Sequence, residues 1–136
     1  MAAIAREALG GDAEIISGRA PEKLPDHVSV ALLIDVLQMM PAGEQEGLLA
    51  AIRSRMPDAG VLFVREADAD AAVGFVRIRI GNRLKAILVG NWAQVFHFRG
   101  AREWQGLFAR LGWIVTSVPV ASSGRFANVL FRLTKR

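Results

Sequence analysis

Hydrophobic residues form two continuous runs, and each run ends in a carboxylate. The first covers Val28–Ile34 and is followed by Asp35, and the second covers Gly60–Glu66. Continuous apolar runs of this length are typical of parallel strands that are buried on both faces of a sheet. The carboxyl ends of such strands line the crevice in which ligands bind. The pattern therefore predicts two parallel strands, the second at Val61–Val64, that deliver acidic side chains to a ligand-binding edge.

Apolar residues at helical spacing predict the helices. Pro41 suits the first turn of a helix, because its missing N–H would have had no partner there. Gly112 suits the position just after a helix, where glycine is common. The predicted helices are Ala2–Leu9, Pro41–Met56, Phe75–Val89 and Ala101–Leu111.

Three further strands complete the predicted order. A short strand at Ala13–Ile16 comes first, and the chain closes with Trp113–Val120 and Phe126–Thr134, joined through Ala121–Arg125 into a hairpin. Right-handed crossovers place parallel strands side by side with helices on both faces. The predicted fold class is α/β, a single-domain, truncated doubly wound (Rossmann-like) sheet of parallel strands followed by a C-terminal antiparallel hairpin.

Composition narrows the chemistry and the partners. The sequence has no cysteine, which excludes disulfides and cysteine nucleophiles. No apolar stretch reaches membrane-spanning length and the N-terminus does not resemble a secretory signal, so we expect a cytoplasmic protein. The net charge is +4, but the arginines form no basic block, which argues against a nucleic-acid partner. The hydrophobic content of 52% indicates apolar surface that another subunit covers.

Candidate functional side chains lie where the predicted strands end. Asp35 either faces a cofactor or substrate, or caps the short segment Val36–Met40. Glu66 and Asp68 follow the second strand, either as substrate-binding groups or as members of a solvated loop.

Two other residues carry chemistry that needs weighing. His97 could act as a general base because its pKa suits proton transfer near neutrality, or it could be a packed residue at the edge of the core. Arg99 could bind an anion or belong to the loop that enters the next helix. No histidines or carboxylates have metal-ligand spacing, and the sequence has no serine elbow or phosphate-binding loop.

Four segments match successive parts of one fold family. They are LLIDVLQMMP (Leu32–Pro41), MPDAGVLFVRE (Met56–Glu66), FHFRGAREWQGLFARLGW (Phe96–Trp113) and FANVLFRLTK (Phe126–Lys135). They are similar to the fourth strand and its helix, the turn into the fifth strand, the helix before the sixth strand, and the antiparallel seventh strand of class I S-adenosylmethionine-dependent methyltransferases. The chain thus resembles the C-terminal half of that family, which implies S-adenosylmethionine as cofactor and a small molecule as methyl acceptor.

The cofactor motifs of the family are missing from the sequence. In the family, a glycine-rich loop cradles the methionine part of the cofactor and an acid binds both ribose hydroxyls. Neither motif is found here. Where the family carries Gly-Asp beside the adenine, this chain has Gly18–Arg19, and a cation cannot accept a hydrogen bond from the adenine amino group. Gln38 stands where relatives often have a histidine.

The resemblance and the strand-end pattern together define a set of candidate site residues. We expect no metal ligands. The candidates are Asp35 and His97 for catalysis, Gly18, Arg19, Asp35 and Val36 for the cofactor, and Gln38, Glu66 and Arg99 for the substrate.

Without the first two strands of the family fold, the strand at Val28–Ile34 becomes an edge. An exposed apolar edge recruits another strand. Ala13–Ile16 could pair with it, two chains could pair around a twofold axis, or a separate chain could supply the missing half. The high hydrophobic content favours the last two outcomes, so we expect a homodimer or a chain that completes the sheet.

Two functions remain open at this point. One is a methyltransferase for a small molecule that is incomplete or inactive as an isolated chain and does not bind S-adenosylmethionine alone. The other is a non-catalytic, methyltransferase-like module for interaction or dimerisation.

Overall fold

The computed structural model describes residues 2–9, 13–70, 80, 95–120 and 128–135. None of the helices in this part of the chain is long and apolar enough to cross a membrane. The elements are α1 (Ala2–Leu9), β1 (Val30–Ile34), the 3-10 helix η1 (Leu37–Met39), α2 (Ala42–Arg55), β2 (Val61–Ala67), α4 (Ala101–Arg110), β3 (Trp113–Val120) and β4 (Asn128–Lys135).

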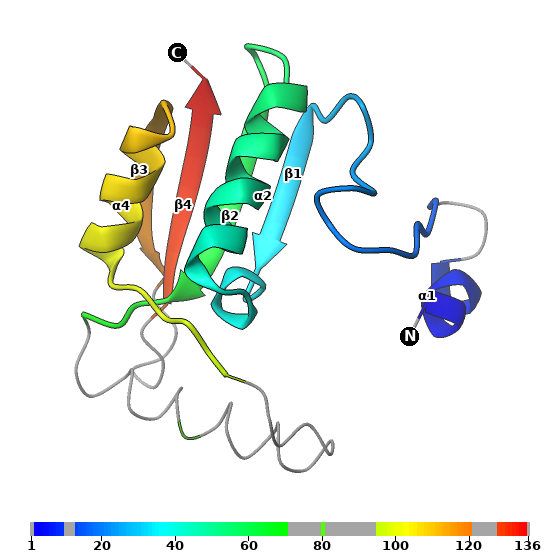
Figure 1. The fold of residues 1–136 in the computed structure, drawn as a ribbon, viewed down its shortest axis with the longest axis horizontal. Helices are drawn as coiled ribbons and strands as arrows, with labels where there is room; N and C mark the ends of the chain where they lie inside the picture. The colour runs from blue at the N-terminus through cyan, green and yellow to red at the C-terminus, as the bar shows by residue number, and fades with distance from the viewer. Residues whose placement is uncertain (1, 10–12, 71–79, 81–94, 121–127, 136) are drawn as a thin grey trace.

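The strands form one mixed sheet in the order β1-β2-β4-β3 (Figure 1). β1 and β2 are parallel, with Val30 opposite Val61. β4 lies antiparallel to both β2 and β3. The sheet confirms the predicted fold class, since a parallel pair joined by a helix is followed by an antiparallel hairpin.

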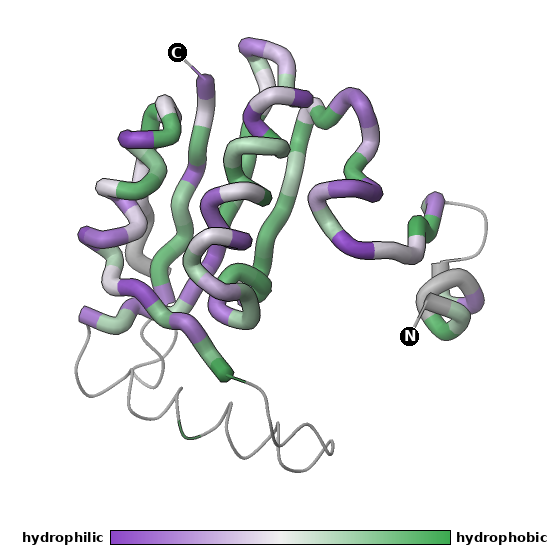
Figure 2. Tube along the Cα trace, in the orientation of Figure 1, coloured by the Kyte–Doolittle hydropathy of each residue, from purple (hydrophilic) through white to green (hydrophobic). Residues whose placement is uncertain are grey.

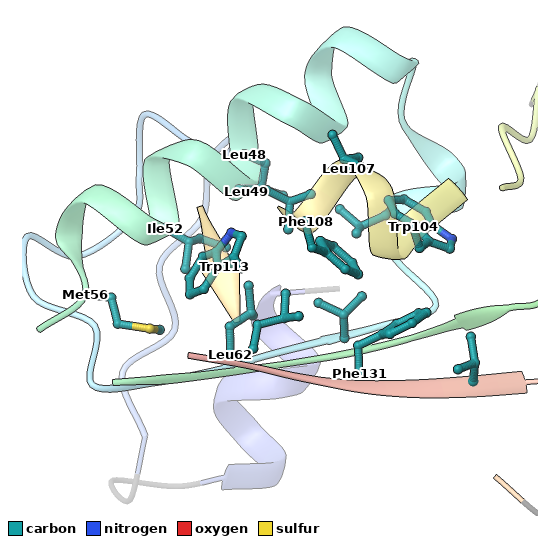
Figure 3. Packing of buried hydrophobic residues seen from close by; sticks show 14 residues of the cluster. Leu48, Leu49, Ile52, Met56, Leu62, Trp104, Leu107, Phe108, Trp113 and Phe131 are labelled. Carbon is teal, nitrogen blue, oxygen red and sulfur yellow. The ribbon is translucent and has the colours of Figure 1, made fainter. Parts of the chain in front are cut away.

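Helices α2 and α4 pack on the same face of the sheet (Figures 1 and 3). Phe108 stacks on Trp104 and meets Phe131 of β4 edge-on, with ring centroids 5.6 and 5.1 Å apart. The predicted helix Phe75–Val89 and the connection Ala121–Arg125 fall outside the described residues, apart from Ile80. The buried core beneath the two helices consists of Leu37, Leu48, Leu49, Ile52, Met56, Leu62, Val64, Trp104, Leu107, Phe108, Trp113, Val129, Phe131 and Leu133.

β1 lies at the edge of the described sheet, as predicted, with β2 as its neighbour. The predicted strand at Ala13–Ile16 is wrong, because this segment forms no strand and does not pair with β1. Helix α1 lies beyond the β1 edge, away from both packed helices (Figure 1). The edge that the sequence predicted is therefore open in the part of the chain that the structure describes.

The face of β1 opposite α2 is apolar and exposed. Val30, Leu32 and Ile34 alternate on this face, and they are 62%, 67% and 43% exposed. Their neighbours Ala31 and Leu33 point the other way and pack against the core. Figure 2 shows hydrophobic residues along the whole strand. The strand therefore has apolar side chains on both faces but a packed layer on only one.

Helix α4 begins on two carboxylates that come from the end of β2. Its N-cap residue, Gly100, has no side chain to offer. The backbone N–H of Ala101 donates to Asp68 Oδ1 at 2.9 Å, and that of Arg102 donates to Asp70 Oδ2 at 3.3 Å. Asp68 is therefore not a member of a freely solvated loop, because it anchors the helix that covers the sheet. Any side chain at Gly100 would collide with the Asp70 carboxylate.

The turn that follows helix α4 contains a glycine in a conformation that favours glycine. Gly112 has φ +82°, a conformation that costs an L-amino acid about 1–2 kcal/mol. Arg53 also donates to the Gly112 carbonyl at 3.1 Å, and an added Cβ would lie 3.1 Å from the same guanidinium. The turn into β3 and its contact with α2 thus depend on this position.

We expect Gly112→Ala to lower the free energy of unfolding by about 1–2 kcal/mol, because alanine is strained at positive φ. The matched control is Gly106→Ala in the middle of α4, where a Cβ meets nothing within 4 Å. That change should raise stability by up to about 1 kcal/mol through helix propensity. Urea unfolding curves measure both, and equal effects at the two positions would contradict this account of the turn.

Candidate functional site

Asp35 stands at the carboxyl end of β1 in a left-handed conformation, with φ +56°. Its backbone N–H donates to the Arg65 carbonyl at 2.9 Å, which extends the parallel pairing by one residue. Its Oδ2 lies 3.5 Å from Arg65 Nη1, and its side chain is 42% exposed. The N-cap of η1 is Val36 and no side chain caps it, so the capping interpretation of Asp35 is wrong. The carboxylate is therefore available at the strand end.

Glu66 is buried at the carboxyl end of β2, only 1% exposed. The solvated-loop interpretation of this residue is wrong, because β2 continues through it to Ala67. Its Oε1 accepts a hydrogen bond from the backbone N–H of Leu37 at 2.8 Å. Burial raises its pKa to about 7, and the nearby Asp35 carboxylate adds to this rise. Glu66, at the end of β2, therefore fixes the turn that follows the neighbouring strand β1.

Gln38 and Val36 occupy the turn after β1. Val36 is exposed, while Gln38 is 6% exposed. Gln38 Nε2 donates to the Asp35 carbonyl at 3.4 Å, and the Gln38 carbonyl accepts from the backbone N–H of His97 at 2.7 Å. This contact brings the segment that carries His97 to the ends of β1 and β2.

Gln45 is the residue that ties these segments together, and the sequence interpretation missed it. Its fully buried Nε2 lies 3.0 to 3.1 Å from the carbonyls of Leu37, Met40 and His97. Its Oε1 accepts from Arg99 Nε at 2.8 Å. The available signal was its place in the apolar stripe of α2 that continues through Leu48, Leu49 and Ile52.

Arg99 is committed to contacts inside the domain. Its side chain is 12% exposed and forms ion pairs with Glu103 and Glu46. Its guanidinium carbon lies 5.4 Å from the centroid of the Trp104 ring. These partners, together with Gln45, satisfy the cation without an external anion. A substrate-binding role for Arg99 remains a prediction.

Gly18 and Arg19 are not joined to the strand ends by any hydrogen bond that the structure describes. Arg19 instead pairs with Glu44 in the first turn of α2, at 2.7 Å, on the surface. This hydrogen bond raises the pKa of Arg19. The strand ends thus gather Asp35, Val36, Gln38 and Glu66, together with the backbone of His97.

The described strand ends do not fit an adenosine-type cofactor on their own. Neither β1 nor β2 is followed by a glycine, because Asp35–Val36 and Asp68–Ala69 stand at those positions. The Leu37 N–H, which could otherwise face a ligand, is already bonded to Glu66. Within the described ranges, no cluster of acidic or histidine side chains could hold a metal ion. Among these strand-end residues, the partly exposed carboxylate of Asp35 is the acidic group that a ligand could contact.

Comparisons with known proteins support the fold. No protein-family model and no curated protein matches the chain. Among solved structures, the mitomycin 7-O-methyltransferase MmcR is similar, with a TM-score of 0.75 and 23% identity over 99% of this chain and 39% of that protein. A S-adenosylmethionine-dependent methyltransferase from Thermotoga maritima, described as a possible histamine N-methyltransferase, has a TM-score of 0.68 and 22% identity. The match covers 100% of this chain and 69% of that protein. The magnesium protoporphyrin IX methyltransferase ChlM from Synechocystis PCC 6803, with bound SAH, has a TM-score of 0.64 and 12% identity. The match covers 98% of this chain and 57% of that protein.

These comparisons confirm the resemblance to the C-terminal half of S-adenosylmethionine-dependent methyltransferases. All three identities are below 25%, so the similarity establishes the fold. The chain spans about two fifths of the length of MmcR and somewhat more than half of ChlM. What those enzymes bind or methylate is a property of the whole proteins.

The raised pKa of Glu66 predicts a pH dependence of stability. From its ordinary value of 4.5 up to about 7, the unfolded chain releases the Glu66 proton while the folded chain keeps it. The free energy of unfolding therefore falls as the pH rises through this window, by about 3 kcal/mol for this group. Glu66→Gln still accepts the Leu37 N–H but does not titrate, so it should lack this part of the slope.

Urea unfolding at a series of pH values tests this, with the difference between wild type and Glu66→Gln isolating the residue from other carboxylates. Glu14→Gln on the exposed N-terminal segment is the control and should keep the wild-type slope. Parallel curves for wild type and Glu66→Gln would show that the buried carboxyl is not protonated in the folded chain.

Replacing Gln45 should destabilise the domain by about 1–3 kcal/mol, because Gln45→Leu leaves buried carbonyls without their donor. Gln105→Leu is the control, since Gln105 is exposed on α4 and bonds Ser117 at 3.1 Å; it should change stability by no more than about 0.5 kcal/mol. Thermal or urea unfolding measures both. A Gln45→Leu variant as stable as wild type would mean that the network contributes no net stability.

Proposed function

We propose that this chain forms the C-terminal part of a S-adenosylmethionine-dependent methyltransferase that acts on a small molecule, and that polypeptide outside these residues supplies the grip on the cofactor. The observation that carries the proposal is the sheet order β1-β2-β4-β3, in which β1 has no neighbour on its outer edge among the described strands. The structural neighbours support it, since MmcR is by name a small-molecule methyltransferase and ChlM holds SAH, the demethylated cofactor.

The geometry of β1 supports a ligand site at its carboxyl end. The chain leaves β1 through η1 and α2, which lies on the packed face of the sheet. A strand added in parallel beside β1, with its own helix on the opposite face, would make this point a topological switch. Doubly wound sheets bind ligands in the crevice outside the carboxyl ends of the strands at such a point. Asp35 and Val36, both accessible, would line that crevice from this chain.

The proposed roles of the site residues follow from what each side chain can do. The carboxamide of Gln38 does not titrate, so it cannot take the place of a histidine as a base. His97 is the candidate base, and hydrogen bonds to Gln38 and Gln45 fix its backbone N–H and C=O. Asp35 is the second candidate for moving a proton. The buried Glu66 positions the turn that carries Asp35 and Val36. Glu66 is also a candidate for binding the substrate.

A second function is a non-catalytic module for protein interaction. The poor fit of the described strand ends to a cofactor favours it, together with the open edge and the exposed apolar side chains of Val30, Leu32 and Ile34. The two functions differ in one measurable property, which is whether S-adenosylhomocysteine binds once the sheet is completed.

We expect the isolated chain to show no binding of S-adenosylhomocysteine by calorimetry, because the described residues lack a glycine cradle. ChlM, which holds this ligand in its structure, is the positive control. Saturable binding to the isolated chain that Asp35→Asn weakens would place a complete cofactor site within this polypeptide. That result would contradict the proposal that the grip on the cofactor comes from elsewhere.

A further inference from the structure

Three ionisable side chains meet where the parallel strands β1 and β2 end: Asp35, Arg65 and Glu66. Successive residues of a strand point to opposite faces, so Arg65 lies beside Ile34 on the face away from α2, while Glu66 lies on the buried face. The left-handed backbone of Asp35 ends the alternation of β1, and its Oδ2 lies 3.5 Å from Arg65 Nη1. Asp35 therefore has Arg65 as its ion-pair partner and Glu66 as a neighbouring carboxyl group.

The two oxygens of the Glu66 carboxyl have different surroundings. Oε1 accepts the N–H of Leu37 at 2.8 Å, whereas Oε2 is buried without a hydrogen-bond partner. A charged carboxylate with one unpaired oxygen is costly to bury, while the neutral acid can carry its proton on that oxygen and leaves no charge in the core. Burial accordingly raises the pKa of Glu66 to about 7. The geometry therefore favours a proton on Oε2.

The other charged and titratable groups around Glu66 are bonded elsewhere. The residue opposite it on β4 is apolar, and α2 brings the uncharged Gln45 to the turn after β1. Asp68, further along β2, accepts from the first turn of α4. Arg99 is held by glutamates of α2 and α4, and His97 meets the turn through its backbone N–H. Within the described residues, the carboxylate at the end of β1 is therefore the charge that acts on this buried group.

We propose that Asp35 and Glu66 share one negative charge, that Arg65 holds this charge on Asp35, and that the proton therefore stays on Glu66. Arg65 is then a positioning residue, because it acts on the site through Asp35. In enzymes, two carboxyl groups whose surroundings differ in this way take the separate roles of base and acid. The consequence for catalysis rests on the proposed methyltransferase function: Asp35, and not Glu66, is the strand-end carboxylate that can take a proton from the methyl acceptor.

The accessibility of the two carboxyl groups supports the same division of roles. The side chain of Asp35 is partly exposed, whereas Glu66 is buried. A ligand beside the end of β1 can therefore contact the Asp35 carboxylate directly. A second charge on Glu66 would be repelled by the charge on Asp35, so the proton on Glu66 keeps the pair at a single charge.

NMR of the Glu66 side-chain carboxyl carbon during a pH titration of the full chain tests the proposal. Asp35→Asn removes the neighbouring charge and should lower the titration midpoint of Glu66 by about half a pH unit. Arg65→Met leaves the Asp35 charge unbalanced and should raise the midpoint by a similar amount, but it should have little effect in the Asp35→Asn chain. Asp58→Asn is the control, because it removes an exposed carboxylate from the turn before β2 and should leave the midpoint unchanged.

Two results would overturn the proposal. A Glu66 midpoint that Asp35→Asn leaves unchanged would show that the two carboxyl groups do not share a charge. An Arg65→Met effect of equal size with and without the Asp35 carboxylate would show that Arg65 acts on Glu66 directly. If Asp35→Asn fails to fold, Arg65→Met and Arg65→Lys still decide the question, because the lysine keeps the cation and should restore the wild-type midpoint. The titration needs no cofactor, so its failure is distinct from a failure of the proposed function.

Discussion

The parallel pairing of β1 with β2 imposes the constraint on which the rest of the structure depends. β1 consists of five apolar residues, and strands of this kind in parallel pairs are normally covered on both faces of the sheet. In the described chain, β2 covers one edge and the core beneath α2 and α4 covers one face. Fully burying a valine, leucine or isoleucine side chain is worth about 1.5–3 kcal/mol, so the exposed face of β1 holds several kcal/mol of unused stabilisation. Natural edge strands carry lysine, proline or a bulge against aggregation, and Val30–Ile34 contains no lysine or proline.

A buried polar network fixes the candidate site beneath this edge. Glu66 and Gln45 approach the turn after β1 from two different elements, and both bond to the backbone of Leu37. Gln45 also bonds to His97 and Arg99, so the segment before α4 is fastened to the same point. Breaking one member of a buried network costs more than an isolated hydrogen bond, because the other members are left without partners in a medium of low polarity. The network therefore makes the strand ends rigid before any ligand or partner arrives.

Strands and helices with strong local hydrophobic patterns were predicted correctly from the sequence. The predictions failed for residues whose position depends on contacts between distant parts of the chain. The runs at β1 and β2, the stripe of α2 and the glycine after α4 are local signals, and they are confirmed. The sequence left Glu66 either as a substrate-binding group or in a solvated loop, and no local signal showed its burial, because its partner Leu37 lies 29 residues away. The strand predicted at Ala13–Ile16 failed for a similar reason, since an isolated short segment forms a strand only when a neighbour is present to pair with it. Gln45 could have been found from its place in the apolar stripe, whereas no local pattern indicates the network that it joins.

The central claim is that β1 is an unpaired edge strand to which further strands can be added. Hydrogen exchange at β1 tests this claim most directly. The N–H of Asp35 and the C=O of Ser29 point at β2, so alternation along the strand turns the backbone groups of Val30, Leu32 and Ile34 outward. In the isolated monomer, the amide protons of these three residues should exchange at least about a hundredfold faster than those of Ala31 and Leu33. Equal protection of all five amides in a monomeric chain would show that the edge is already covered and would contradict the account.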